Sequence, residues 1–422
     1  MNGRRRKGKV GIALAGGGPL GGIYEIGALV ALEQALRGVD LTGLDLYVGV
    51  SSGAFVAAWL ANGISPGEMY AMFILDRSHH DPFEPELLLR PAFGEYMQRL
   101  MMLPQLMQSA LFAYAGASPF RGFVESFARL TRGLPTGLFD NGAIASYLSR
   151  LFGKQGRTDD FRKLPHKLFI VAAELDTGKA TAFGAPGFDH VPISQAVKAS
   201  SALPGLYPPA RIDGRDYVDG ALKKTLHASV ALKEGAKLLL CVNPLVPYDA
   251  DLAAASGAKP RPLAERGLVT VLSQTFRALI YSRMRVGIDR YKTEFPDADV
   301  VLFEPARDDE VIFFANIFSY ADRKRLAEHA YRHTLSELER RADELEPIFA
   351  HHGIAIDRAA LKGSLPGPEK AGQKGGLWDS VKPLEAALGA LEKALNRDRA
   401  RSRSAPARLR GGREPGGRVA GG

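Results

Sequence analysis

The sequence has almost no cysteine and no long apolar run. Cys241 is the only cysteine among 422 residues, so no intrachain disulfide can form, which is typical of proteins in a reducing cytosol. No uninterrupted apolar stretch approaches the ~18 residues that a membrane-spanning helix needs, and the stretch after the basic N-terminus is broken by glycines. We therefore expect a cytoplasmic protein without a signal peptide or a spanning helix, which contacts a membrane only peripherally.

Net charge is nearly absent from the body of the chain. Of the formal net charge of +9, residues 1–9 contribute +5 and residues 396–422 contribute +6, which leaves −2 for the rest. We expect a basic N-terminal tail at 1–9 and a largely disordered basic tail at 364–422, because the latter is rich in Gly, Pro and Ser. Such a tail can attract anionic phospholipid or nucleic acid, or only keep the protein in solution, so no specific nucleic-acid partner is predicted.

Short apolar segments alternate with helical patterns along the first half of the chain. The periodicity predicts strands at 10–15, 45–50, 167–173 and 237–243, and helices at 22–37 and 52–62. This alternation predicts an α/β fold with a mainly parallel sheet. In such sheets the functional groups gather beyond the carboxyl ends of the strands.

Residues 76–160 interrupt the alternation and predict a helical insertion. Met97, Leu100 and Met101 share one helix face there. A methionine-rich face suits a lid that contacts lipid, but we interpret it as an ordinary core helix.

The composition changes again after residue 245, and residues 246–363 predict a helical C-terminal extension. It opens with a Pro- and Ala-rich linker at 244–262, followed by a long helix at 266–291. One face of this helix, which arginines flank, consists of five apolar residues: Leu272, Phe276, Leu279, Ile280 and Met284. A basic amphipathic helix can lie on a membrane, but we expect this face to pack on the core of the domain.

The first glycine motif is Gly16-Gly17-Gly18-Pro19-Leu20-Gly21, directly after the first predicted strand. Backbone N–H groups in such a loop can bind an anion at the start of a helix. The same spacing fits a dinucleotide-binding loop, but that alternative requires an acidic residue at the end of the second strand. A serine motif stands there instead, so a nucleotide site is not expected.

The second motif, Gly49-Val50-Ser51-Ser52-Gly53, has the spacing of a nucleophile elbow. Glycines on both sides of the serine allow a tight turn from strand to helix. The turn places the Ser51 hydroxyl near the positive end of the next helix, where a developing anion is stabilised. The two motifs together predict an oxyanion hole and a nucleophile, as acyl transfer needs.

A serine nucleophile also needs a base. Asp219-Gly220-Ala221 ends another apolar segment and places a carboxylate at a strand end. His227 is the best candidate for a Ser-His-Asp triad, although no histidine lies in a motif typical of a catalytic one. No cluster of His, Cys and Asp has the spacing of a metal site, so neither a metal nor an organic cofactor is expected.

In these motifs the chain resembles the patatin-like phospholipases. The resemblance covers residues 10–245 and rests on three motifs in order: Gly16–Gly21, Gly49–Gly53 and Asp219–Ala221. It implies a three-layer α/β/α domain in which Ser51 and Asp219 form a catalytic dyad without a histidine. It also implies an oxyanion loop that includes Gly16, Gly17, Gly18 and Gly21, an elbow with Gly49 and Gly53, and a DGA motif with Gly220 and Ala221.

The resemblance implies a serine lipid acyl hydrolase of the phospholipase A or lysophospholipase type, acting on lipid at a membrane or micelle surface. Members of the family often carry Arg or Lys where this chain has Leu20, so a neutral lipid or ester becomes a stronger candidate substrate. General carboxylesterase or acyltransferase chemistry and a non-catalytic lipid-binding module stay open as alternatives, and the sequence gives no oligomeric state.

Overall fold

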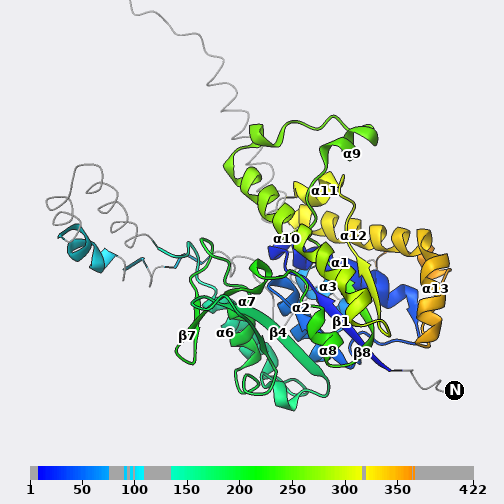
Figure 1. Cartoon of the computed structure of the whole chain (residues 1–422), viewed down its shortest axis with the longest axis horizontal. Helices are drawn as coiled ribbons and strands as arrows, with labels where there is room; N and C mark the ends of the chain where they lie inside the picture. The colour runs from blue at the N-terminus through cyan, green and yellow to red at the C-terminus, as the bar shows by residue number, and fades with distance from the viewer. Residues whose placement is uncertain are drawn as a thin grey trace, which may run out of the picture. The chain divides into compact units, whose positions relative to one another are not determined.

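An eight-stranded sheet forms the centre of the described chain (Figure 1). The computed structural model describes residues 8–75, 90–92, 96–97, 100–108, 135–315, 320–363 and 365. The sheet order is β6-β7-β4-β3-β1-β8-β9, with β5 paired to β4. Its strands are β1 (Lys9–Leu14), β3 (Leu46–Gly49), β4 (Lys167–Glu174), β5 (Ala180–Phe183), β6 (Ala210–Ile212), β7 (Arg215–Asp219), β8 (Ala236–Val242) and β9 (Asp299–Phe303).

Five neighbouring strands, β4-β3-β1-β8-β9, run parallel, whereas β5, β6 and β7 are antiparallel to their partners. The mainly parallel sheet is therefore confirmed, with an antiparallel side beyond β4. A separate pair, β2 (Leu36–Arg37) and β10 (Ala355–Ile356), is antiparallel.

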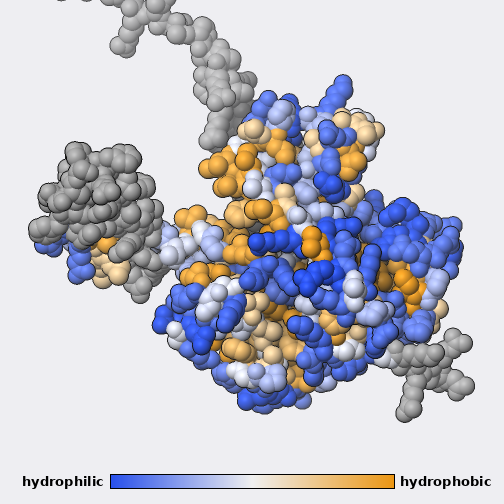
Figure 2. Space-filling view, in the orientation of Figure 1, coloured by the Kyte–Doolittle hydropathy of each residue, from blue (hydrophilic) through white to orange (hydrophobic). Residues whose placement is uncertain are grey.

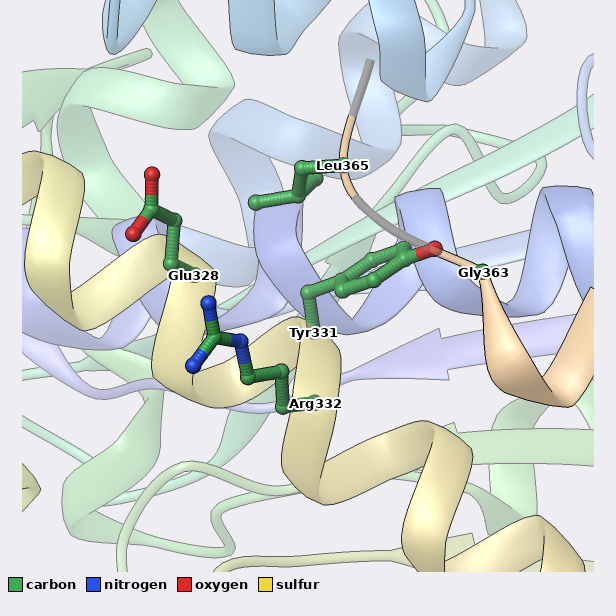
Figure 3. Close-up of a pocket in the computed structure, with 5 residues that line it drawn as sticks. All are labelled: Glu328, Tyr331, Arg332, Gly363 and Leu365. Atoms are coloured by element: carbon green, nitrogen blue, oxygen red, sulfur yellow. The ribbon is translucent and has the colours of Figure 1, made fainter. Parts of the chain in front are cut away.

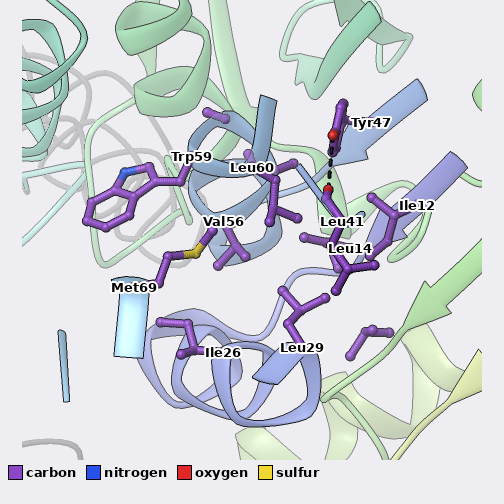
Figure 4. Packing of buried hydrophobic residues seen from close by; sticks show 14 of the residues in the cluster. Ile12, Leu14, Ile26, Leu29, Leu41, Tyr47, Val56, Trp59, Leu60 and Met69 are labelled. Carbon is purple, nitrogen blue, oxygen red and sulfur yellow. Dashed lines mark hydrogen bonds between the residues drawn. The ribbon is translucent and has the colours of Figure 1, made fainter. Parts of the chain in front are cut away.

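Helices cover both faces of the sheet, which confirms the three-layer α/β/α architecture. Ile12 and Leu14 of β1 pack on one face with α1 (Gly18–Ala35) and α2 (Ser52–Ala61), as Figure 4 shows. Ala13 points to the other face, toward α8 (Ser229–Lys233) and the end of α10 (Leu268–Glu294). The further helices are α3 (Pro66–Phe73), α6 (Gly142–Phe152), α7 (Ile193–Ser200), α9 (Ala250–Ala255), α11 (Glu310–Phe313), α12 (Tyr320–Arg340) and α13 (Ala342–His351).

The strands β1, β3, β4 and β8 lie within one or two residues of their predicted bounds. The first helix differs, because α1 begins at Gly18, inside the glycine motif, and not at residue 22. Pro19 stands in its first turn, where the missing N–H costs no helical hydrogen bond. The glycine motif is therefore the start of a helix as much as a loop.

Beyond the end of β3, the same edge of β4 pairs with β7. Ala172 of β4 pairs with β7 on one side and with β5 on the other, while Ile170 pairs with β3 and β5. Hence β3 and β7 lie one after the other along the same edge of β4, and β7 runs toward the end of β3. This topology brings Asp219, the last residue of β7, to the turn that follows Gly49.

The C-terminal region is helical, as predicted, but it also adds a strand. Strand β9 pairs with β8 in the main sheet, and α12 packs closely along α1. The predicted linker at 244–262 contains the helix α9. Of the predicted basic tails at 1–9 and 364–422, residues 1–7, 364 and 366–422 lie outside the described residues, and Lys9 begins β1.

Two expectations about buried helix faces are wrong. Met97, Leu100 and Met101 are 54%, 57% and 71% exposed, so they do not form an ordinary core face. On α10, Leu272, Phe276 and Leu279 are exposed too; only Met284 of the predicted face is buried, and Ile280 is half-buried. The helix instead buries a face that contains Arg277 and Tyr291.

Cys241 is buried in the sheet, and burial raises the pKa of its thiol. None of the helices in the described part of the chain is both long and apolar enough to span a bilayer.

Candidate active site

Ser51 sits on a strained turn between β3 and α2. Its φ of 53° and ψ of −121° are unusual for a residue with a side chain, and such strain costs roughly 1–3 kcal/mol. A Cβ on Gly49 would lie 2.5 Å from Cα of Ala54, and one on Gly53 would lie 2.5 Å from the carbonyl of Leu14. Only glycine fits at these two positions, so the elbow is built by the residues that the motif contains.

The structure brings Ser51 and Asp219 into direct contact across 168 positions of sequence. The Ser51 hydroxyl donates a hydrogen bond of 2.6 Å to Oδ2 of Asp219. The other carboxylate oxygen, Oδ1, accepts the N–H of Ala221 at 2.8 Å, which fixes the orientation of the carboxylate. Both side chains are buried, with 6% and 3% of their surface exposed.

Burial dominates the electrostatics of Asp219. It raises the pKa of the carboxyl group to about 6, while the hydrogen bonds from Ser51 and from the Ala221 N–H act in the opposite direction. No ion pair links Asp219 to a cation in the described part of the chain. The carboxylate is therefore a stronger base than an exposed aspartate and is still ionised at neutral pH.

A second serine, Ser200, holds the elbow in place. Its hydroxyl accepts the N–H of Ser51 at 2.9 Å and donates to the carbonyl of Val171 at 2.6 Å. Two residues on, the carbonyl of Ala202 accepts the N–H of Asp219 at 3.0 Å. The last residue of α7 and the turn that follows it thus position Ser51 and Asp219. Ser200 lies outside the three motifs and was not predicted as a residue of the site.

The glycine motif lies beside the serine. A Cβ on Gly16 would be 3.1 Å from Cβ of Ser51 and 2.8 Å from Cβ of Ala221, so the backbone approaches the site as closely as packing allows. The N–H groups of Gly17 and Gly18 find no acceptor among the residues that the structure describes, whereas the N–H of Gly21 bonds to the Gly17 carbonyl. Two backbone donors are therefore without an acceptor among the described residues, at the start of the helix that follows Gly16.

Comparison with known proteins identifies the family of this domain. The sequence pattern of the patatin-like phospholipases matches residues 12–232, just over half of the chain. The chain belongs to the patatin-like phospholipase family. The match spans the elbow, the glycine motif and Asp219, and it identifies an ester-hydrolysing domain, as the motifs predict.

Curated relatives of this patatin-like domain include uncharacterized NTE family proteins of Mycobacterium tuberculosis and Mycobacterium bovis. They are 26% identical over 234 residues, which is 56% of this chain but only 30% of theirs. Among solved structures, VipD of Legionella pneumophila aligns at 15% identity over 79% of this chain and 67% of its own, with a TM-score of 0.36. The effector ExoU, with a TM-score of 0.33, aligns at 16% over 79% and 53%.

His227 of the patatin-like domain forms no hydrogen bond with Ser51 or Asp219 among the described residues. Its Nε2 is 3.3 Å from the carbonyl of Gly220. Burial lowers the pKa of His227 to about 4, so the ring is neutral at pH 7. The contacts do not assemble the Ser-His-Asp triad.

Leu20 of α1, the position that often carries a cation in the family, is half-buried against the hydrophobic core. The described residues contain no group of three or more His, Cys, Asp and Glu that could hold a metal ion.

A hollow of about 340 Å³ lies at the other end of α1 (Figure 3). Its lining includes Glu328, Tyr331 and Arg332 of α12, and the Tyr331 hydroxyl bonds to Gln34 at 2.6 Å. Gln34 is sixteen residues along α1 from Gly18, or about 24 Å at the rise of an α-helix. This hollow is therefore separate from the site at Ser51.

Proposed function

We propose that the protein is a serine lipid acyl hydrolase of the phospholipase A or lysophospholipase type. The observation that carries the proposal is the 2.6 Å hydrogen bond between the elbow serine and a buried aspartate whose pKa is raised to about 6. A nucleophile and a base in contact, beside free backbone donors, are the groups that acyl transfer requires.

In the first step the Ser51 oxygen attacks the carbonyl carbon of the ester while its proton passes to Asp219. The tetrahedral intermediate collapses when the bond to the leaving alcohol breaks, and protonated Asp219 returns the proton to the alcohol oxygen. An acyl-serine remains. Water then attacks the acyl-serine carbonyl while Asp219 accepts a proton from the water. When the second tetrahedral intermediate collapses, Asp219 returns this proton to the Ser51 oxygen, and the free fatty acid leaves.

The negative charge of the tetrahedral oxygen needs donors that are in place beforehand. The free N–H groups of Gly17 and Gly18 are the proposed oxyanion hole, together with the N–H of Ser52 at the start of α2. Pro19 has no N–H and contributes none. Removal of one such donor typically lowers the rate 100- to 1,000-fold. A base of moderate strength must rely on other groups for a contribution of this size.

The substrate class follows from the family and from Leu20. Lipid esters are the family's substrates, but an apolar residue at this position supplies no cation for an anionic head group. We therefore favour a neutral or zwitterionic lipid, with general carboxylesterase or acyltransferase chemistry on neutral lipids as the second candidate.

Replacement of the two dyad residues tests the function. We expect Ser51→Ala and Asp219→Asn each to lower the release of fatty acid from a fluorogenic phospholipid by about 10,000-fold, with the fold unchanged by circular dichroism. A fluorophosphonate should label the wild type at Ser51 and leave Ser51→Ala unlabelled.

Two control variants make the result specific. Ser146→Ala removes an exposed hydroxyl on α6, and His227→Gln removes the imidazole of the alternative triad. Both are expected to keep most of the activity. Full activity in Asp219→Asn, or loss confined to His227→Gln, would contradict the dyad.

A further inference from the structure

We propose that the outer face of α10 is a docking surface for a bilayer that contains anionic phospholipid. The role of this surface rests on the proposed lipid acyl hydrolase function, whereas the binding itself can be measured without catalysis.

The outer face of α10 carries one continuous exposed stripe. Its members follow one another at intervals of three or four residues, which places them on one side of a helix: Leu268, Leu272, Phe276, Leu279, Arg283, Val286 and Arg290. We call these seven residues the α10 stripe. Its apolar members are between 47% and 72% exposed, although residues of this kind are usually buried.

The opposite face of the helix is the one that packs. Arg277, Met284 and Tyr291 recur at intervals of seven and are buried. The apolar side of α10 is thus turned to solvent, and Figure 2 shows hydrophobic residues gathered along this helix. An exposed apolar surface rimmed by polar residues marks an interaction site.

The charge around the stripe indicates the partner. Between residues 259 and 294 there are eight arginines and lysines against three acidic residues, although the chain without its tails carries a net charge of −2. Arg283 stands within the stripe and forms no ion pair among the described residues. Apolar side chains interleaved with long cationic ones suit the boundary between acyl chains and phosphate groups, where the stems lie in apolar surroundings and the heads reach the phosphates.

The inner face of α10 is fastened to the segment that covers the glycine motif. Gln274 exchanges two hydrogen bonds with the backbone of Tyr248, at 3.0 and 2.7 Å, and Arg277 donates to the carbonyl of Val246 at 3.1 Å. Pro244 precedes Val246 by two residues, and its ring lies 2.6 Å from the position that a Cβ on Gly17 would take. Docking of the stripe therefore holds the proposed oxyanion loop close beneath the lipid surface.

Binding is tested with the Ser51→Ala protein, which does not degrade the vesicles. Its co-sedimentation is measured with vesicles of phosphatidylcholine alone and with 30% phosphatidylglycerol added. We expect Phe276→Glu with Leu279→Glu to weaken binding to both vesicles on the order of 100-fold. Arg283→Glu should weaken binding only to the anionic vesicles, by about 10-fold or more, with the difference lost at high salt.

Leu175→Glu is the matched control, because Leu175 is 50% exposed on the turn after β4 and lies outside the stripe. It should bind vesicles like the parent. Unchanged vesicle binding by the Phe276/Leu279 variant would overturn the proposal. So would a stripe variant that converts a dimer to a monomer in light scattering while vesicle binding stays the same, since the stripe would then be a protein interface.

Activity measurements keep the two proposals distinguishable. With Ser51 present, the stripe variants should hydrolyse a soluble, monomeric short-chain ester like the wild type, and should lose activity only on vesicles. Vesicle binding that depends on the stripe in a chain without any esterase activity would support docking and contradict the proposed function.

Discussion

Asp219 keeps a carboxyl group almost fully buried, and among the described residues its donors are the Ser51 hydroxyl and the N–H of Ala221. Removing a carboxylate from water is unfavourable, and two hydrogen bonds offset only part of that cost. The result is the raised pKa of about 6. The same desolvation that suits Asp219 to its proposed role as a base makes its ionised form a source of instability.

This instability predicts an unusual pH dependence. The pKa of Asp219 is about 6 in the folded protein against 3.8 for the free group, so the folded state holds the proton where the unfolded state has lost it. Wild-type stability should therefore fall as pH rises from about 4 to 6, by up to about 3 kcal/mol. Asp219→Asn removes this loss, and urea unfolding at pH 8 should show it to be the more stable protein. An Asp219→Asn protein that is less stable than the wild type at pH 8 would contradict this account.

The residues of the site differ in how well the sequence reveals them. Ser51 and Asp219 could be predicted because each sits in a short motif whose glycines are demanded by local backbone geometry. Ser200 and Pro244 could not, because their contacts join segments that are far apart in sequence and are fixed only by the packing of the sheet. No local spacing marks a serine that accepts one particular distant N–H.

At the level of elements, the buried parallel strands were the most predictable part. Their apolar runs are short and continuous, and each lies between turn residues. The inner face of α10 was not predictable. Arg277 and Gln274 point inward because they bond to the backbone at 246–248, so a helical pattern that assumes apolar residues inside selects the wrong face.

The contact between α1 and α12 depends on one glycine. A Cβ on Gly27 would lie 2.3 Å from the carbonyl of Ala327, so the two helices would have to separate. We expect Gly27→Ala to lower the free energy of unfolding by about 1–3 kcal/mol, measured by urea denaturation.

The matched change on another helix should act in the opposite direction. A Cβ on Gly287 of α10 would meet nothing nearer than the Tyr291 hydroxyl at 3.8 Å. Gly287→Ala is expected to stabilise the protein by up to about 1 kcal/mol, since alanine is the better helix former. Equal effects of the two substitutions would show that close packing at Gly27 is not what matters.

At the scale of the whole molecule, the catalytic motifs and the C-terminal region are parts of one structure. Strand β9 extends the sheet and α12 covers α1, so residues beyond the family match complete the core. The sequence indicated a helical extension, but it did not indicate that this extension adds a strand to the main sheet. The pattern of a five-residue edge strand does not reveal which sheet the strand joins.

In the described part of the chain, the residues up to Leu365 form one compact unit by their contacts. Deletion of 366–422 should therefore leave the unfolding temperature within about 2 °C, or roughly 1 kcal/mol for a domain of this size, and keep hydrolysis of a monomeric ester. Differential scanning calorimetry and an esterase assay check this. A drop of many degrees would mean that the removed segment is part of the folded core.

The head-on arrangement of β3 and β7 has a consequence for the protein as it is made. The nucleophile leaves the ribosome 168 residues ahead of its base, which at about 5–20 residues per second is a delay of roughly 10–30 seconds. Under the proposed dyad, a half-synthesised chain carries the serine but cannot cleave lipid, and neither can a fragment that ends before Asp219. The proposed activity thus becomes possible only after the first half of the chain has been made. The strands β8 and β9, which complete the sheet, follow after Asp219.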